Sequence, residues 1–135
     1  MAEAEVLAVD PGREKVGFAV IDKKGGVLHL NILERAEVGT NLKNLLAEFT
    51  PQILVMGDGT GSRQLAEEIR PLLPDELELK FIDEKGSSAR AARLYRQREG
   101  NIISRSLGRI IDWRPNRPLD DYAALVLAKK YLRNK

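Results

Sequence analysis

The order of the apolar segments along this chain constrains its fold more than any other feature. Residues 5–9 and 16–22 are short runs rich in Val, Ile and Ala, joined by a turn that contains Pro and Gly. Such runs are typical of β-strands. A Lys-Lys-Gly-Gly turn leads directly into a third run, Val27 to Val38, with partial alternation of apolar and polar residues. The pattern predicts a meander of three strands at the start of the chain.

The rest of the sequence alternates between helical and strand patterns. The expected segments are a helix over 40–49 capped by Thr40, a strand over 52–57, a helix over 63–73, a strand over 77–82, an Arg-rich helix over 88–99 and a last helix over 119–132. Residues 101–118 fit a short helix followed by a loop, but their pattern is ambiguous. A meander followed by crossover units predicts a mixed sheet with helices on its faces.

Length and composition limit the class of protein. The 135 residues suffice for one domain, which we expect to span 1–135. The chain has no Cys, which excludes a disulfide scaffold, a thiolate zinc site and a thiol nucleophile. No apolar stretch approaches the roughly 18–20 residues of a membrane span, and the acidic N-terminus is unlike a secretory signal. We therefore expect a cytoplasmic protein without a membrane partner.

Basic residues are concentrated in one segment. Between Lys85 and Arg117 there are nine basic and two acidic residues, so this segment carries +7, and the rest of the chain carries −5. Eight of the nine basic residues are Arg, whose guanidinium group binds phosphate in a bidentate manner. A solvated helix face would also carry such a run, but the one-sided distribution favours a polyanionic partner.

Acidic residues stand at the ends of several predicted elements. Loops at the carboxyl ends of strands converge in an open α/β sheet, so Asp10 and Glu84 would meet if their strands are neighbours. At about 100° per residue, Asp120 and Asp121 both fall on the apolar side of the last helix. Helix capping is the alternative explanation for this pair. The acidic positions are Asp10, Asp58, Asp83, Glu84, Asp120 and Asp121.

Clustered carboxylates require a compensating cation, because they repel one another and raise each other's pKa. Their hard oxygen atoms suit Mg²⁺ or Mn²⁺ rather than Zn²⁺. The single histidine, His29, lies within a predicted strand, where packing is a better explanation than catalysis. Together with the Arg-rich segment, the acids suggest metal-assisted hydrolysis of phosphodiester bonds.

Three motifs resemble those of a known family. The Asp-Pro-Gly segment 10–12, followed by Gly17, resembles the first motif of RuvC-type Holliday junction resolvases. Asp-Glu-Lys-Gly-Ser-Ser at 83–88 resembles the Asp-Glu-Arg-x-Ser-Thr motif of the YqgF (RuvX) family. Asp-Asp-Tyr-Ala-Ala at 120–124, with Leu127, resembles the terminal helix of that family. The motifs occur in the family's order across nearly the whole chain.

The resemblance implies a fold and an activity. The fold would be α/β and RNase H-like, with a five-stranded mixed sheet, strands 1–3 antiparallel, and helices on both faces. The activity would be that of a divalent-metal-dependent endonuclease, acting on DNA junctions or on structured RNA such as ribosomal RNA precursors, as a monomer or weak homodimer. Asp10, Glu84 and Asp120 would be the catalytic and metal-binding acids, with Asp121 replacing Asp120 if the helix register slips by one.

The residues expected to contact nucleic acid lie on the first turn, in the second motif and along the Arg-rich helix. In that helix, Ala89, Ala92 and Tyr95 are expected to face the sheet, leaving an outward stripe of arginines. The expected contacts are Arg13, Lys15, Lys85, Ser87, Arg90, Arg93 and Arg96.

The sequence departs from the family pattern in one loop, and other functions remain open. The family usually has Gly-Leu-Pro where this chain has Gly57-Asp58-Gly59, which leaves open whether Asp58 is an additional ligand. One alternative is an RNase H-like module that binds nucleic acid without cleaving it. Another is a fragment of an actin-like nucleotide-binding protein, which shares the opening motif but needs two such domains.

Overall fold

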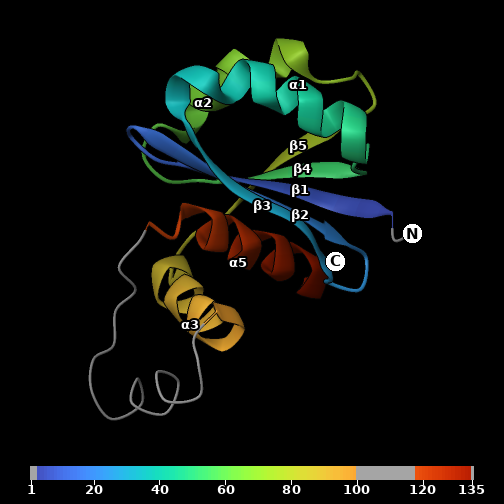
Figure 1. Ribbon diagram of the computed structural model, residues 1–135. Helices are drawn as coiled ribbons and strands as arrows, with labels where there is room; N and C mark the ends of the chain where they lie inside the picture. Colours follow the sequence, from blue (N-terminus) through green and yellow to red (C-terminus); the bar gives the residue numbers. More distant parts are fainter. Residues whose placement is uncertain (1–2, 100–117, 135) are drawn as a thin grey trace.

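The computed structural model describes residues 3–99 and 118–134 and shows a central β-sheet with helices on both faces (Figure 1). The ambiguous segment 101–118 therefore lies outside the described residues, except for Pro118. None of the described helices is long and apolar enough to cross a membrane.

Five strands form one mixed sheet, as predicted. They are β1 (Ala4–Pro11), β2 (Lys15–Asp22), β3 (Val27–Glu34), β4 (Ile53–Gly57) and β5 (Glu78–Ile82). Their order in space is β3-β2-β1-β4-β5. The first three strands pair antiparallel, which confirms the meander. β4 pairs parallel with β1, and β5 pairs parallel with β4.

Helices cover both faces of this sheet. The described helices are α1 (Val38–Phe49), α2 (Ser62–Ile69), α3 (Ser87–Glu99) and α5 (Asp120–Arg133), with 3-10 turns over Arg35–Glu37 and Arg70–Leu72. Figure 1 shows α1 and α2 on one face and α5 on the other, with α3 beyond α5. This arrangement is the predicted sheet with helices on both faces.

The first helix begins earlier than the sequence pattern predicted. The third strand ends at Glu34, and α1 starts at Val38 rather than after a Thr40 cap. Val38, Leu42 and Leu45 are buried at helical spacing, so packing against the sheet extends the helix towards its N-terminus. Thr40 is exposed and lies within the helix.

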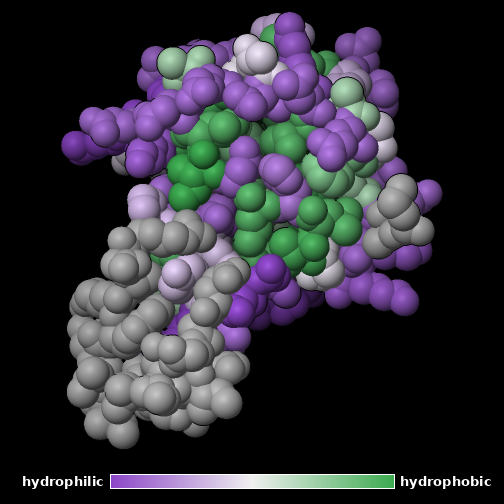
Figure 2. Space-filling view, viewed as in Figure 1, coloured by the Kyte–Doolittle hydropathy of each residue, from purple (hydrophilic) through white to green (hydrophobic). Residues whose placement is uncertain are grey.

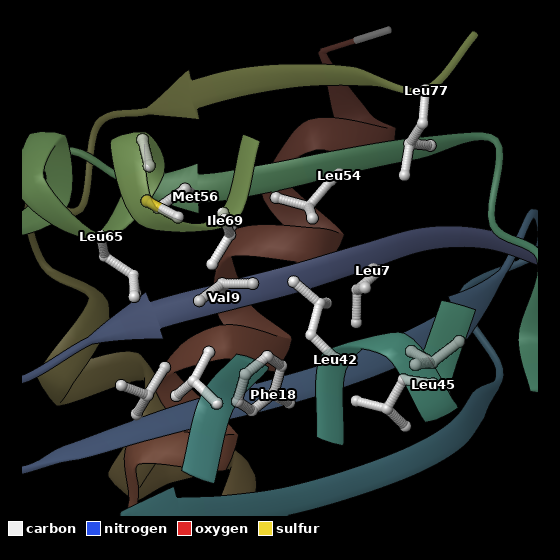
Figure 3. Packing of buried hydrophobic residues seen from close by; sticks show 14 of the residues in the cluster. Leu7, Val9, Phe18, Leu42, Leu45, Leu54, Met56, Leu65, Ile69 and Leu77 are labelled. Atoms are coloured by element: carbon white, nitrogen blue, oxygen red, sulfur yellow. The ribbon is translucent and has the colours of Figure 1, made fainter. Parts of the chain in front are cut away.

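The central strand contributes to two separate cores. Side chains alternate along β1, so Leu7 and Val9 pack under α1 and α2 (Figure 3), whereas Val6 and Ala8 pack against α5. β1 and β4 are buried on both faces, which explains their continuous apolar runs. The residues at the carboxyl ends of β1 and β4 are therefore attached to the buried centre of the sheet.

The exposed edge of the sheet differs from its centre. β3 is an edge strand, and its residues from Val27 to Leu33 are half-buried rather than buried. Figure 2 shows apolar side chains in a band over β3, between hydrophilic side chains of the helical layers. His29 lies in this strand with its ring 5.5 Å from that of Phe49 in α1, so it packs as expected.

The Arg-rich helix does not pack in the expected way. α3 packs against α5 rather than against the sheet, and Ala91 is buried whereas Ala89 is exposed. The expectation that Ala89 and Ala92 face the sheet is therefore wrong. Because α5 is enclosed by the sheet and α3, every residue of α5 from Asp121 to Ala128 is buried.

Candidate active site

Asp10 lies one residue before the end of β1, where it pairs with Gly17 of β2. Burial, together with the negative charges of the nearby Glu84 and Asp120, raises the pKa of the Asp10 carboxyl from 3.8 to about 7. A carboxylate held at the end of a buried strand thus experiences a high cost of ionisation. The structure therefore places three of the predicted acids close enough to interact.

Glu84 reaches Asp10 although their strands are not neighbours. β4 lies between β1 and β5, and it ends at Gly57. A Cβ atom on Gly57 would lie 3.1 Å from Glu84 Oε2 and 3.4 Å from Asp10 Oδ1. A Cβ atom on Gly59 would overlap the Glu84 carboxylate. The two glycines therefore leave the space through which Glu84 crosses the end of β4.

The loop that carries Glu84 is held by hydrogen bonds on both sides. The backbone N–H of Glu84 donates to Asp58 Oδ1 at 3.3 Å, and the backbone N–H of Asp58 donates to the Ile82 carbonyl at 3.1 Å. Lys130 Nζ, on α5, donates to the Asp83 carbonyl at 2.8 Å. Asp58 thus has a structural role in this loop, and it is not among the carboxylates that raise the pKa of Asp10.

Asp120 is brought to Asp10 by a close approach of α5 to β2. A Cβ atom on Gly17 would overlap the carbonyl of Asp120, so only glycine allows α5 to start beside this strand. Gly17 pairs with Asp10 in the sheet, which explains why Asp120 acts on the pKa of Asp10. The close approach gives a physical reason for the glycine seven residues after Asp10.

Asp121 has a different environment from Asp120. Its side chain is 6% exposed, and its Oδ1 accepts a hydrogen bond from the backbone N–H of Tyr122 at 2.9 Å. The N-cap position of α5 is Leu119, so neither acid is the N-cap residue, although both lie in the first turn. The structure favours Asp120 over Asp121 as the member of the acidic site.

We call Asp10, Glu84 and Asp120 the carboxylate cluster. Within residues 3–99 and 118–134, no three Asp, Glu, His or Cys side chains are arranged as a ready-made cage for an ion. The chemistry of the donors nevertheless fits Mg²⁺ or Mn²⁺, since all three are hard carboxylate oxygens. Burial raises the pKa of Asp10, and the negative charges of Glu84 and Asp120 raise it further.

The residues predicted to bind nucleic acid divide into two groups. Arg13 and Lys15 are exposed in the β1–β2 turn, and Lys85 is exposed directly after Glu84. These three lie at the same edge of the sheet as the carboxylate cluster. Ser87, by contrast, is only 8% exposed, which leaves a nucleic-acid strand little access to its hydroxyl group.

The α3 arginines form the second group. Arg90 and Arg93 are exposed, whereas Arg96 is half-buried, so the predicted stripe of three is incomplete. Arg90 and Arg93 line a hollow together with residues of α5 and of the β2–β3 turn. The sequence did not predict that residues of α5 and of the β2–β3 turn lie beside these arginines. Its only indication was that Lys129 and Arg133 are one helical turn apart.

The fold and the cluster together define a class of protein: an RNase H-like domain with acids at the ends of two strands and at the start of a helix. Its structure is similar to that of T. thermophilus RuvC in complex with a Holliday junction substrate, with a TM-score of 0.53, 18% identity, and coverage of 96% of this chain and 94% of that chain. It is also similar to the yeast mitochondrial Holliday junction resolvase Ydc2, with a TM-score of 0.57, 13% identity, and coverage of 98% and 79%. At these identities the similarity establishes the fold.

The chain belongs to the Tex protein YqgF-like domain family, which matches residues 4–103. This match confirms the resemblance stated from the motifs. It contains Asp10 and Glu84, whereas Asp120 lies beyond it. None of the curated proteins compared with this sequence matches it.

Proposed function

We propose that this protein is a divalent-metal-dependent endonuclease that hydrolyses phosphodiester bonds in structured nucleic acid. The observation that carries the proposal is the carboxylate cluster, in which Asp10 has a pKa of about 7 next to Glu84 and Asp120. Packing a partly buried acid against two others lowers the stability of the fold, so stability does not explain this arrangement. Such an arrangement is expected where the acids have a chemical role.

The three acids of the cluster would hold Mg²⁺ or Mn²⁺. When bound, such ions activate a water molecule and stabilise the charge on the leaving oxygen. Gly57 and Gly59 leave space for the Glu84 carboxylate at the end of β4. Arg13, Lys15 and Lys85 would bind the phosphates on either side of the reacting one, without reading the base sequence.

The substrate we propose is a DNA junction or a structured RNA such as a ribosomal RNA precursor. Of the two similar solved structures named above, one is RuvC in complex with a Holliday junction substrate and the other is the Holliday junction resolvase Ydc2. These two structures support a DNA junction as the substrate. The basic segment after Glu84 suits either nucleic acid, because it would contact phosphates. A resolvase that cuts two strands symmetrically needs two active sites, and we propose that this chain is a monomer or a weak homodimer.

A cleavage assay on three substrates tests the proposal. Four-way junctions, linear duplexes and structured RNA are incubated with Mg²⁺, with Mn²⁺ and with EDTA, using the wild-type protein and Asp10→Asn. We expect cleavage of at least one structured substrate with metal, none with EDTA, and none by the variant. Binding without cleavage under every condition would instead identify a nucleic-acid-binding module that lacks catalysis.

A further inference from the structure

The hollow lined by Arg90 and Arg93 has a volume of about 520 Å³ and lies along the later turns of α5. We call it the basic hollow. Three elements form it: α3, α5 and the turn between β2 and β3, which Figure 1 shows at the C-terminal end of α5. The residues that line it are Lys24, Gly25, Arg90, Arg93, Leu94, Val126, Lys129, Leu132 and Arg133.

The lining of the basic hollow carries five positive charges and no acid. The basic residues are Lys24, Arg90, Arg93, Lys129 and Arg133. Among the described residues, none of them forms an ion pair with a carboxylate. The acid at the neighbouring turn, Asp22, is already engaged, because its Oδ1 accepts the backbone N–H groups of Lys24 and Gly26 at 2.9 and 2.8 Å.

The arrangement of the cations suits a ligand with more than one phosphate. Arg90 and Arg93 are about one turn apart on α3, and Lys129 and Arg133 are one turn apart on α5, so two adjacent helices each present a pair. Like charges at this spacing destabilise a helix unless an anion compensates them. Arginine binds phosphate oxygens in a bidentate manner, and an uncompensated basic concavity attracts polyanions.

The basic hollow adjoins the loop that carries Glu84. Arg90 lies six residues after Glu84 on the same segment, and Lys130, next to Lys129 on α5, donates a hydrogen bond to the carbonyl of Asp83 at 2.8 Å. A nucleic-acid strand bound at the carboxylate cluster therefore lies within reach of the hollow.

We propose that the basic hollow binds the phosphate backbone of the substrate beside the bond that is cleaved. That the hollow and the carboxylate cluster bind the same strand rests on the proposed nuclease function, whereas the binding of phosphates does not. In this arrangement the hollow adds affinity and fixes the direction in which the strand leaves the carboxylate cluster. Contacts of this kind position the nucleic acid without specifying its sequence.

The test uses a double variant of the two α5 residues, Lys129→Gln with Arg133→Gln. The matched control is Lys43→Gln with Arg70→Gln, which removes the same charge from exposed positions on the opposite helical layer. Both are made in an Asp10→Asn background, so that binding is measured without cleavage. The dissociation constant for junctions, duplexes and structured RNA is measured as a function of salt, and melting curves check folding.

We expect the α5 variant to weaken binding by about 10-fold or more at low salt. The slope of log K against log salt should fall by roughly 0.9 for each duplex phosphate that the variant no longer neutralises. The control should bind as the parent does.

Two results would overturn the proposal. Equal weakening by the α5 variant and the control would show a general charge effect and no site. Unchanged nucleic-acid binding by the α5 variant would exclude a backbone role. If that variant then failed to bind ATP or tripolyphosphate that the parent binds, the hollow would bind free phosphates instead. Failure of the wild-type protein to cleave any substrate would contradict the nuclease function but leave these binding results intact.

Discussion

The two ends of α5 carry opposite charges and differ in how that charge is solvated. The first turn has Asp120 and Asp121, and the last turn has Lys130 and Arg133. The helix dipole favours both arrangements, so the helix alone does not distinguish them. Asp121 is buried, and Asp120 raises the pKa of a neighbouring acid, whereas Arg133 is exposed. The clustered acids therefore lower stability, whereas the exposed charge of Arg133 has little effect on it.

This difference determines what substitutions should do at each end. At the acidic end, removing a charge should change cleavage, stability or both, depending on which acid is replaced. At the basic end, it should change binding alone, because exposed charges contribute little to stability. Variants of both ends test that separation, beginning with the largest expected effect.

Asp10→Asn should reduce metal-dependent cleavage by orders of magnitude. The amide keeps the shape of the side chain but loses the negative charge that a divalent cation requires. Nucleic-acid affinity should remain near that of the wild type, because the basic residues are untouched. Initial cleavage rates and equilibrium binding, measured on the same substrate, check both parts. Cleavage at the wild-type rate would exclude a metal-binding role for Asp10.

Asp120→Ala and Asp121→Ala should separate activity from stability within one helical turn. Asp120→Ala should abolish cleavage, because it removes a member of the carboxylate cluster. Asp121→Ala should retain most activity but lower the free energy of unfolding by about 1–3 kcal/mol, since it removes a buried acceptor for the Tyr122 N–H. Cleavage rates and urea denaturation compare the two variants. The reverse ranking would show that Asp121 is the ligand.

Gly17→Ala should damage both the fold and the site. The added methyl group would overlap the Asp120 carbonyl, so α5 must shift away from β2 and carry Asp120 with it. We expect a loss of about 1–3 kcal/mol in unfolding free energy and a marked loss of cleavage. The control is Gly39→Ala in α1, where the new Cβ would make an ordinary contact, 3.6 Å from Leu72. Equal stability of the two variants would contradict the close approach at Gly17.

Part of this site could be predicted from the sequence and part could not. Asp10 was identified because it ends a buried apolar run, and Asp120 because it lies on the apolar side of its helix. The proximity of Asp10 and Glu84 depends on strand order and on the absence of a side chain at Gly57, neither of which local patterns encode.

The packing of α3 shows the same limit. Because alanines stand at positions 89, 91 and 92, the sequence is compatible with more than one buried face of α3. Packing against α5 is what buries Ala91. The basic hollow combines Lys24 with residues of two distant helices, so it depends on tertiary contacts throughout. Short-range periodicity therefore predicted elements and single residues, whereas the relations between elements required the structure.

The last expected effect concerns stability alone. Asp10, which lies beside the acidic end of α5, should make stability depend on pH, whereas the residues of the basic end should not. In EDTA, the folded protein holds Asp10 with a pKa of about 7, against an ordinary value of 3.8. Between these values the folded state binds more protons than the unfolded state, so stability falls as pH rises. The contribution of Asp10 is complete below about pH 4 and lost above about pH 7. Asp10→Asn should lack this loss and be more stable than the wild type at pH 8, by about 1–4 kcal/mol.

Other groups titrate in the same range, so the measured quantity is the difference between wild type and variant in urea denaturation at pH 5 and pH 8. Lys129→Gln with Arg133→Gln should show the wild-type dependence, because neither residue is among the groups that shift the pKa of Asp10. If Asp10→Asn follows the wild type at both pH values, the Asp10 carboxyl is not destabilised by its neighbours. If the α5 variant flattens the profile instead, the two ends of α5 are coupled, and the separation between a chemical end and a binding end does not hold.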